Sequence, residues 1–160
     1  MGRRMAGRDA PRTGRLVVEA VRAAGVRAVL ATGWGGIAST GSTDVLVIDQ
    51  APHDRLFPRM SAVVHHGGGG TTAAALAAGV PQVVCPFVAD QPHWAHRAHL
   101  LGVAPPPLRQ QELTATALAA AITTAVHDEA IRRRAEGGGR VVRAEDGVAQ
   151  AVAALEHLVR

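Results

Sequence analysis

The chain has 160 residues, which fits one compact domain and does not require a second hydrophobic core. About half of the residues are apolar and only 2% are aromatic, which favours an α/β fold over an aromatic all-β core. The net charge is +4, and residues 1–15 hold five Arg against one acid, so the excess of positive charge lies in this segment. It predicts a short basic arm followed by one domain over residues 16–160, and it excludes a basic nucleic-acid-binding face on that domain. The single cysteine, Cys85, excludes an intramolecular disulfide, and no run reaches the roughly 18 apolar residues of a membrane span, so we expect a cytoplasmic protein.

The first predicted elements are a helix and three short strands. Apolar residues recur at helical spacing from Leu16 to Ala24 and stop at Gly25, which predicts an amphipathic helix with a glycine end. Three apolar runs rich in β-branched residues follow, separated by loops rich in Gly, Ser, Pro and Asp. They predict buried strands over residues 26–31, 45–48 and 62–64.

A βαβ unit occupies the middle of the chain. A helix of small residues is predicted over 71–78, and Gly79 and Pro81 separate it from a fourth strand over 82–85. Such units form parallel sheets covered by helices, so the sequence predicts a Rossmann-like parallel sheet flanked by helices. Later helices are predicted over residues 91–101, 111–127 and 146–159, and three glycines, residues 137–139, predict the interruption of a further helix.

The most informative stretch is the glycine-rich loop between the third strand and the next helix. Residues 65–72 read His-His-Gly-Gly-Gly-Gly-Thr-Thr. Glycines let the backbone approach a ligand closely, and the first turn of a helix offers free N–H groups and a positive dipole end. The loop is therefore a candidate cradle for a diphosphate. The alternative is an ordinary glycine turn in which Thr71 only caps the helix.

Two known phosphate-binding patterns narrow the class of nucleotide protein. A Walker A loop needs a Lys after its last glycine, and the chain contains no Lys, so that class of nucleoside triphosphatase is excluded. Gly68, Gly70 and Ala73 satisfy the dinucleotide pattern after a strand, but the nearest acidic residue, Asp90, lies beyond Pro86 in a loop. An NAD-dependent oxidoreductase is therefore a weaker alternative.

The loop after the fourth strand carries a polar pair, Asp90 and Gln91. Ligands of open α/β sheets bind at the carboxyl ends of the strands, so this pair should face the same crevice as the glycine-rich loop. A carboxylate beside an amide suits the neighbouring hydroxyls of a sugar. The alternative is that Asp90 caps the following helix.

Other catalytic or metal-binding arrangements find little support in the sequence. His93, His96 and His99 recur at three-residue steps, but the outer two lie about 120° apart around a helix, and no cysteine or carboxylate completes a set of ligands. Exposed helical histidines are the simpler interpretation. The chain has no G-x-S-x-G motif, so nothing indicates a Ser-His-Asp hydrolase.

Several ordered motifs together resemble the carboxyl-terminal domain of UDP-glycosyltransferases, in the manner of sterol 3-β-glucosyltransferases and bacterial antibiotic glycosyltransferases. The resemblance covers most of the chain and implies one half of a GT-B fold. It also implies that the first strand of that half is lost, because residues 2–5 stand where this strand would end. The motifs lie at residues 32–36, 51–58, 62–68, 78–81, 90–92 and 145–148.

The resemblance implies which residues hold a nucleotide sugar. His66 would contact the diphosphate of the donor, and Asp90 with Gln91 would bind the sugar hydroxyls. Gln50 and Ala51 would lie near the nucleotide base. Backbone and hydroxyl donors around the diphosphate would come from Gly68, Gly69, Gly70 and Thr71.

By the same resemblance the donor would be a UDP-sugar, with UDP-glucose expected, and a hexose would pass with inversion to a hydroxyl of a lipid, sterol or natural product. The reaction would need no metal and no other cofactor. We expect no catalytic residue on this chain, because the general base and the acceptor pocket of the family belong to an amino-terminal domain, which would be a separate partner. The alternative is an inactive nucleotide-binding or interaction fragment of the same family.

Overall fold

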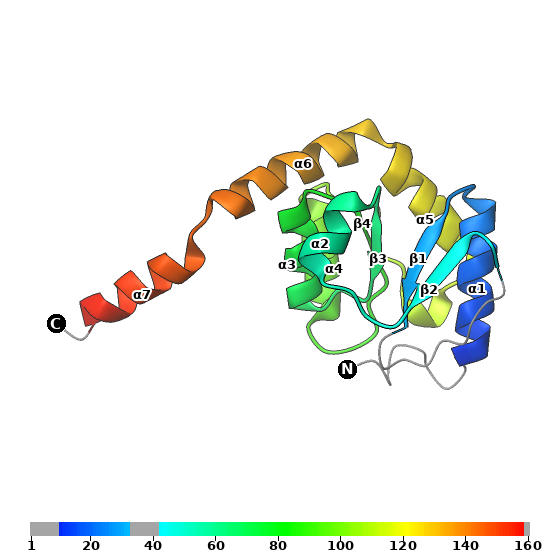
Figure 1. Cartoon of the computed structure of the whole chain (residues 1–160), viewed down its shortest axis with the longest axis horizontal. Helices are drawn as coiled ribbons and strands as arrows, with labels where there is room; N and C mark the ends of the chain where they lie inside the picture. The colour runs from blue at the N-terminus through cyan, green and yellow to red at the C-terminus, as the bar shows by residue number, and fades with distance from the viewer. Residues whose placement is uncertain (1–9, 33–41, 159–160) are drawn as a thin grey trace.

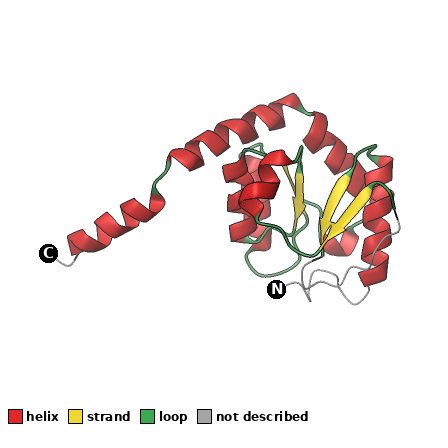
Figure 2. Ribbon diagram, viewed as in Figure 1, coloured by secondary structure: helices red, strands yellow, loops and turns green. Residues whose placement is uncertain are grey.

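The structure is a computed structural model that describes residues 10–32 and 42–158. Figure 1 shows a body of strands and helices from which the last helix projects, and Figure 2 shows the strands in the middle of that body. The described elements are α1 (Ala10–Ala23), β1 (Ala28–Ala31), β2 (Val45–Ile48), α2 (His53–Leu56), η3 (Phe57–Arg59), β3 (Val63–His65), α3 (Gly69–Ala78), β4 (Gln82–Val84), α4 (Gln91–Leu100), η4 (Gln110–Glu112), α5 (Ala115–His127), α6 (Glu129–Ala144) and α7 (Gly147–Leu158).

The four described strands form two separate sheets of two parallel strands each. β1 pairs with β2 so that Ala28 is opposite Val45, and β3 pairs with β4 so that Val63 is opposite Gln82. These pairings confirm the predicted α/β class with short parallel strands. The residues at which the resemblance places the end of a lost first strand, 2–5, lie outside the described residues.

Helices cover both faces of β4, because successive side chains of a strand point to opposite sides. Val83 is fully buried in a cluster with residues of α1 and α5. Val84 points the other way and packs with Ala98 of α4 and Ala135 of α6. The body is therefore layered as helix, sheet and helix, as the βαβ pattern predicts.

The predicted interruption at glycines 137–139 is wrong, because α6 runs through them without a break. A methyl group on Gly139 would lie 2.6 Å from the Gly79 Cα and 2.9 Å from the Leu76 carbonyl oxygen. The backbones of α6 and α3 thus approach so closely that only glycine fits between them. The packing at this crossing offsets the low helix propensity of the three glycines.

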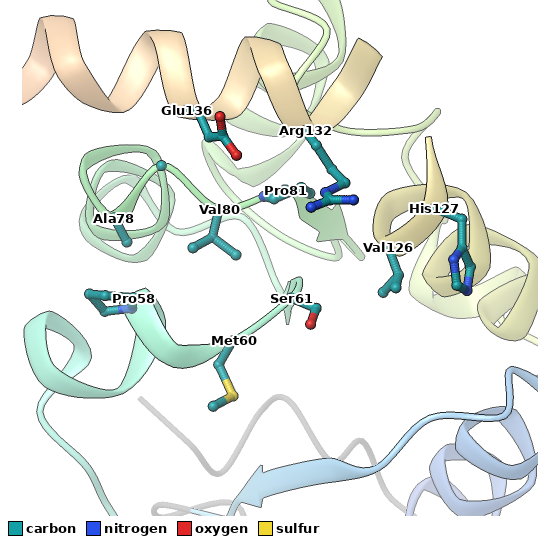
Figure 3. A pocket seen from close by; sticks show the side chains of 11 residues that line it. Pro58, Met60, Ser61, Ala78, Val80, Pro81, Val126, His127, Arg132 and Glu136 are labelled. Atoms are coloured by element: carbon teal, nitrogen blue, oxygen red, sulfur yellow. The ribbon is translucent and has the colours of Figure 1, made fainter. Parts of the chain in front are cut away.

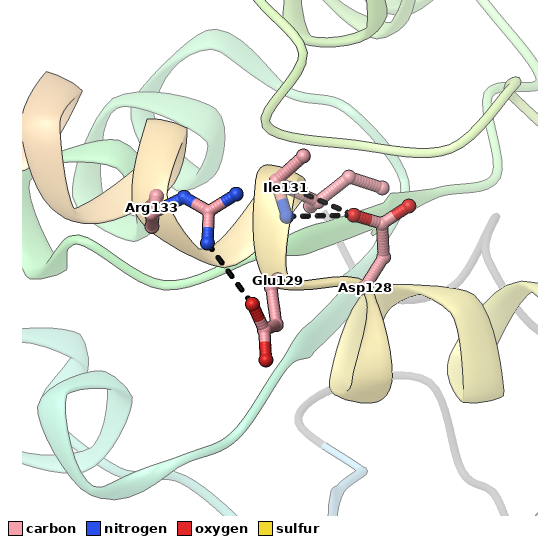
Figure 4. A network of polar contacts seen from close by, with 5 residues as sticks. Asp128, Glu129, Ile131 and Arg133 are labelled. Carbon is pink, nitrogen blue, oxygen red and sulfur yellow. Dashed lines mark hydrogen bonds and ion pairs between the residues drawn. The ribbon is translucent and has the colours of Figure 1, made fainter.

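The first turn of α6 is capped by a side chain (Figure 4). The Asp128 carboxylate accepts hydrogen bonds from the backbone N–H groups of Ala130 and Ile131, at 2.8 and 3.1 Å. Glu129 and Arg133, one turn apart, form an exposed ion pair at 3.0 Å. A carboxylate at the N-cap and an ion pair at this spacing both favour a helix that starts here.

The starts of α1, α5 and α7 differ from the predicted ones. α1 begins at Ala10, so the boundary expected after residue 15 falls inside a helix, while residues 1–9 lie outside the described part of the chain. α5 begins at Ala115, because Thr114 caps it by accepting a hydrogen bond from the Ala117 N–H at 3.1 Å. α7 begins one residue later than predicted, and none of its described residues is buried.

Candidate functional site

The glycine-rich loop joins the end of β3 to the start of α3, and Gly67 fixes its path. Gly67 has a φ of +87°, in the left-handed region that favours glycine. A methyl group there would lie 2.8 Å from Val84 Cγ1 and 3.1 Å from the Gln91 carbonyl oxygen. The loop therefore packs tightly against β4 and α4, and a side chain at Gly67 would push it away.

A buried polar network supports the loop from within the body. His65 Nδ1 accepts a hydrogen bond from the Gly67 N–H at 3.0 Å, so the neutral ring carries its proton on Nε2 and donates it to Gln82 Oε1 at 2.8 Å. The Gln82 amide group in turn donates to the Thr72 carbonyl oxygen at 3.4 Å. Burial lowers the pKa of His65 to about 4, so the ring is neutral at pH 7.

The sequence analysis gave no role to His65 or Gln82. The available signal was the alternation along β3, which turns His65 inward while the neighbouring Val64 side chain is exposed. Gln82 could not be recognised from the sequence, because the role of an amide in a short strand depends on the residue to which it hydrogen bonds across the sheet.

The first turn of α3 presents unpaired backbone donors. Its N-cap is Gly68, which has no side chain with which to cap the helix, and the Thr72 N–H donates to the Gly68 carbonyl oxygen at 2.9 Å. The N–H groups of Gly69, Gly70 and Thr71 precede that bond, so they have no partner within the helix and stand at its positive dipole end. Because the helix begins two residues before the predicted start, the alternative in which Thr71 caps it is wrong.

His66 lies against the start of this helix. A methyl group on Gly68 would come within 2.5 Å of His66 Nε2, so the ring rests on the Gly68 backbone. Burial lowers the pKa of His66, and the charge of Asp90 partly opposes that shift. A neutral imidazole beside open N–H groups can donate a further hydrogen bond to a phosphate oxygen.

Asp90 and Trp94 connect α4 to the glycine-rich loop. Trp94 Nε1 donates a hydrogen bond to Asp90 Oδ2 at 2.8 Å, and a methyl group on Gly69 would lie 3.2 Å from the same nitrogen. Asp90 occupies the N-cap position of α4 without making a capping hydrogen bond, so the alternative in which it caps the helix is wrong. Trp94 is a site residue that the sequence analysis missed, because its link to Gly69 exists only in the folded chain.

Gln91 is buried, with 1% of its surface exposed. Its Oε1 accepts hydrogen bonds from the N–H groups of Phe87 and Val88, at 3.0 and 3.2 Å. The side chain therefore holds the loop that leads to Asp90, including Ala89 at a φ of +57°. Gln91 thus positions the loop, and its direct contact with a sugar stays a prediction.

The structure brings His66, the α3 amino terminus and Asp90 together, but it does not join the predicted base-binding pair to them. Gln50 is exposed and Ala51 is half-buried, and both lie between β2 and α2. No hydrogen bond among the described residues connects either one to the glycine-rich loop. Their place beside a nucleotide base stays a prediction.

A cavity of about 600 Å³ lies near the amino ends of β3 and β4, away from the glycine-rich loop (Figure 3). Met60 and Ser61 border it on one side, and Arg132 and Glu136 of α6 on another. None of the predicted site residues lines it. The cavity is therefore separate from the candidate site.

The described histidines do not form a metal centre. Within residues 10–32 and 42–158, no three His, Cys, Asp or Glu side chains are grouped closely enough to hold a metal ion. His99 Nδ1 lies 3.1 Å from the Ala104 carbonyl oxygen, and His93 packs edge-on against Trp94. No described helix is both long enough and apolar enough to cross a membrane.

Comparisons with known proteins lead to one family. Residues 31–154 match the model of the erythromycin biosynthesis protein CIII-like C-terminal domain. The chain is 42% identical over 146 residues to a sterol 3-beta-glucosyltransferase of Arabidopsis thaliana, an alignment that covers 89% of this chain and 23% of the relative. Two solved structures are similar in fold: the glycotransferase of kitacinnamycin, with a TM-score of 0.78 and 28% identity, and the glycosyltransferase VinC in complex with dTDP, with 0.72 and 25%. Those matches cover 89% and 91% of this chain, and 39% and 40% of the two structures.

The site and the comparisons point the same way. The open amino terminus of α3, His66 and Asp90 lie where the strands of open α/β sheets end and bind ligands. The chain spans about a quarter of the length of its plant relative and two fifths of the solved structures. Because the family model matches residues 31–154, the chain belongs to the EryCIII-like C-terminal domain family of GT-B glycosyltransferases.

Proposed function

We propose that the chain is the donor-binding half of a glycosyltransferase, and that the first turn of α3 binds the diphosphate of a nucleotide sugar. The observation that carries this proposal is the bare helix start, where a glycine N-cap leaves the N–H groups of Gly69, Gly70 and Thr71 without helical partners. The His66 ring lies against the same backbone. Three donors, a positive dipole end and an imidazole suit a diphosphate.

The same groups would serve the chemical step. When a sugar leaves a nucleotide diphosphate, negative charge grows on the departing phosphate oxygen. Fixed N–H donors and the His66 ring would stabilise that charge without a metal, because donors that are held in place beforehand need no reorganisation as the charge develops. His66 is thus proposed to act as an electrostatic residue and not as the general base.

The sugar is proposed to lie toward Asp90. Its carboxylate is exposed, and although Oδ2 binds Trp94, the group can still accept hydrogen bonds from sugar hydroxyls. We propose UDP-glucose as the donor on the likeness to a sterol 3-beta-glucosyltransferase. VinC was solved with dTDP, so a dTDP-sugar is the competing donor.

Transfer is proposed to proceed with inversion. A hydroxyl oxygen of a lipid, sterol or natural product would attack the anomeric carbon, and the bond to the diphosphate would break with its electrons leaving on the phosphate oxygen. A base from a second, acceptor-binding domain would take the hydroxyl proton. The share of the relative that this chain covers, 23%, supports such a partner. The cytoplasmic location stays a prediction.

A second candidate is a nucleotide-binding or interaction fragment without turnover of its own. The observation that favours it is the division of the sheet into two pairs of strands. Such a fragment would still bind the donor diphosphate at the first turn of α3.

Calorimetric titration of the chain with UDP tests the proposal. We expect saturable binding, and we expect His66→Ala to weaken it at least about tenfold, since a hydrogen bond to a charged group contributes roughly 1.5–3 kcal/mol. His127→Ala is the matched control, because this exposed histidine borders the separate cavity and should leave UDP affinity unchanged. A folded wild-type chain that binds neither UDP nor dTDP would contradict donor binding, and tighter binding of dTDP would reassign the nucleotide.

A further inference from the structure

The start of α4 leaves the Asp90 carboxylate without a capping role. An N-cap aspartate normally accepts a hydrogen bond from the second or third N–H group of its helix. In α4 the second residue is Pro92, which has no N–H, and the third, His93, donates its N–H to the Asp90 carbonyl oxygen at 3.0 Å. The Gln91 N–H before them donates to the Val88 carbonyl oxygen at 3.3 Å. The helix start is therefore complete without the carboxylate.

The carboxylate binds instead to the indole of Trp94, one turn along the helix. The Nε1–H donates to Oδ2 at 2.8 Å, a short bond of the kind that a charged acceptor forms. The other oxygen, Oδ1, makes no hydrogen bond with any residue that the structure describes. Asp90 is exposed, so one of its oxygens is fixed by a neighbour and the other is open to a ligand.

The indole ring is itself held by its surroundings. A methyl group on Gly69 would lie 3.2 Å from Nε1, 3.4 Å from Cε2 and 3.6 Å from Cζ2, so the ring rests on the first residue of α3. The His93 ring packs edge-on against the indole, with the ring centroids 5.3 Å apart. A donor that is held in this way can fix the direction of the carboxylate that it binds.

Gln91 does not give the Asp90 carboxylate its direction. Its Oε1 accepts hydrogen bonds from the backbone N–H groups of Phe87 and Val88, so it fixes the path of the main chain that leads to Asp90. The Asp90 side chain can still rotate about its own bonds. Among the described residues, only Trp94 forms a hydrogen bond with the carboxylate. The direction of the carboxylate therefore depends on the indole.

The carboxylate lies near the candidate diphosphate site. Burial lowers the pKa of His66, and the charge of Asp90 opposes that shift, so the two side chains are close enough to interact. Gly69, on which the indole rests, carries one of the N–H groups proposed to bind the diphosphate. In a nucleotide sugar the sugar is bonded directly to the diphosphate. A hydroxyl acceptor that is tied to the first turn of α3 is thus well placed to bind the sugar.

We infer that Trp94 is a positioning residue for the sugar: its indole N–H holds Oδ2 of Asp90 and directs Oδ1 toward a hydroxyl of the sugar. The inference rests on the proposed binding of a nucleotide sugar and names the residue that orients the sugar-binding group. A carboxylate that rotates freely has to be ordered when the sugar binds, and that loss of freedom weakens binding. A carboxylate that is held beforehand avoids the loss. Trp94 therefore acts on the affinity for the sugar and not on the affinity for the nucleotide.

Calorimetric titration of the full chain with UDP and with UDP-glucose tests the inference. Trp94→Phe keeps an aromatic ring beside Gly69 and removes the N–H donor. We expect it to weaken UDP-glucose binding about fivefold and to change UDP affinity less than about twofold, because one hydrogen bond of ordinary strength loses its fixed geometry. A residue that only supported the fold would weaken both ligands alike. His96→Ala is the control and should leave both affinities unchanged, since this exposed side chain lies about 200° around the helix from Trp94.

Two further variants show whether Trp94 acts through Asp90. Asp90→Ala should also weaken UDP-glucose selectively, and Trp94→Phe added to it should cause no further loss, because the indole then has no carboxylate to hold. Replacement of Trp94 by β-(3-benzothienyl)alanine puts sulfur in place of the N–H and keeps the size of the ring system. It should weaken UDP-glucose as Trp94→Phe does, and it decides the question if Trp94→Phe does not fold.

The outcomes separate this inference from donor binding itself. A folded wild-type chain that binds neither UDP nor dTDP would contradict donor binding and this inference with it. A chain that binds UDP, but whose preference for UDP-glucose is the same in the wild type and in both Trp94 variants, would overturn this inference alone. A further loss when Trp94→Phe is added to Asp90→Ala would also overturn it. If dTDP binds more tightly than UDP, dTDP and dTDP-glucose take the place of the uridine pair in the same comparison.

Discussion

His65 stabilises the candidate site from inside the body without facing the ligand. Its ring joins the Gly67 N–H to Gln82 Oε1, so the neutral form with the proton on Nε2 satisfies both partners. Burial lowers its pKa to about 4, and the hydrogen bond with Gln82 partly opposes that shift. Protonation would place a hydrogen on Nδ1 against the Gly67 N–H, so the histidine links the geometry of the loop to pH.

At the residue scale, we expect the free energy of unfolding to fall as the pH is lowered from about 6.5 to about 4. In that window the unfolded histidine binds a proton and the folded one does not, so the stability from neutral His65 is complete above the unfolded pKa and is lost toward the folded one. The shift corresponds to roughly 3 kcal/mol. Urea titrations across this range, compared with His65→Gln, isolate the effect. Equal slopes with pH for both proteins would contradict it.

The contact between α3 and α6 shows how the packing of one element allows another to form. Gly139 lies where the α6 backbone meets Gly79 at the end of α3, while a methyl group on Gly137 would meet only Arg140 Nη2, at 3.9 Å. The Arg143 guanidinium adds a hydrogen bond to a carbonyl oxygen at the end of α3. The three neighbouring glycines therefore have different roles, although they look alike in the sequence.

At the element scale, Gly139→Ala should lower the free energy of unfolding by about 1 to 3 kcal/mol, because its methyl group would overlap backbone atoms that cannot move independently. Gly137→Ala is the matched control. It should raise the free energy of unfolding by up to about 1 kcal/mol, since alanine is the better helix former and the space around its Cβ is open. Denaturant unfolding of both variants measures the difference. A Gly139→Ala protein as stable as the Gly137→Ala protein would mean that the helices are farther apart.

The whole molecule consists of a packed body and a projecting end. α6 lies along the body and buries Ala135 and Gly139, whereas α7 points away from it in Figure 1 and buries none of its residues. Val148 and Leu155 of α7 are 79% and 64% exposed. The stability of the body should therefore depend on α6 and not on α7.

At the scale of the whole molecule, we expect a chain that ends at Asp146 to keep its thermal midpoint within about 2 °C, because the removed helix contributes no buried surface to the body. A chain that ends at Asp128 also loses α6 and should unfold at a much lower temperature. Calorimetric melting of the three lengths measures both effects. A large loss on removal of α7 alone would show that it packs on the body in solution.

Much of the fold and part of the site could be predicted from the sequence. Apolar periodicity gave the parallel strands and most helices, because it is a local property that the folded chain retains. The run of glycines after β3 predicted an open helix start, since few other residues could follow that path. The contacts of Asp90 could not be predicted, because Trp94 and the helix cap compete for the carboxylate and only the folded geometry decides between them.

The sequence by itself determined the α/β class, the strand–glycine–helix unit and the family, since these depend on residue order and spacing. Only the tertiary structure decided that α6 continues through its glycines, that Gln91 is buried and holds a loop, and that His65 is a neutral support. It also decided that the described strands form two pairs and not one sheet. The path of α6, the support by His65 and the pairing of the strands depend on partners distant in the sequence, and the burial of Gln91 depends on the packing of its helix, so these outcomes arise only when the elements pack together.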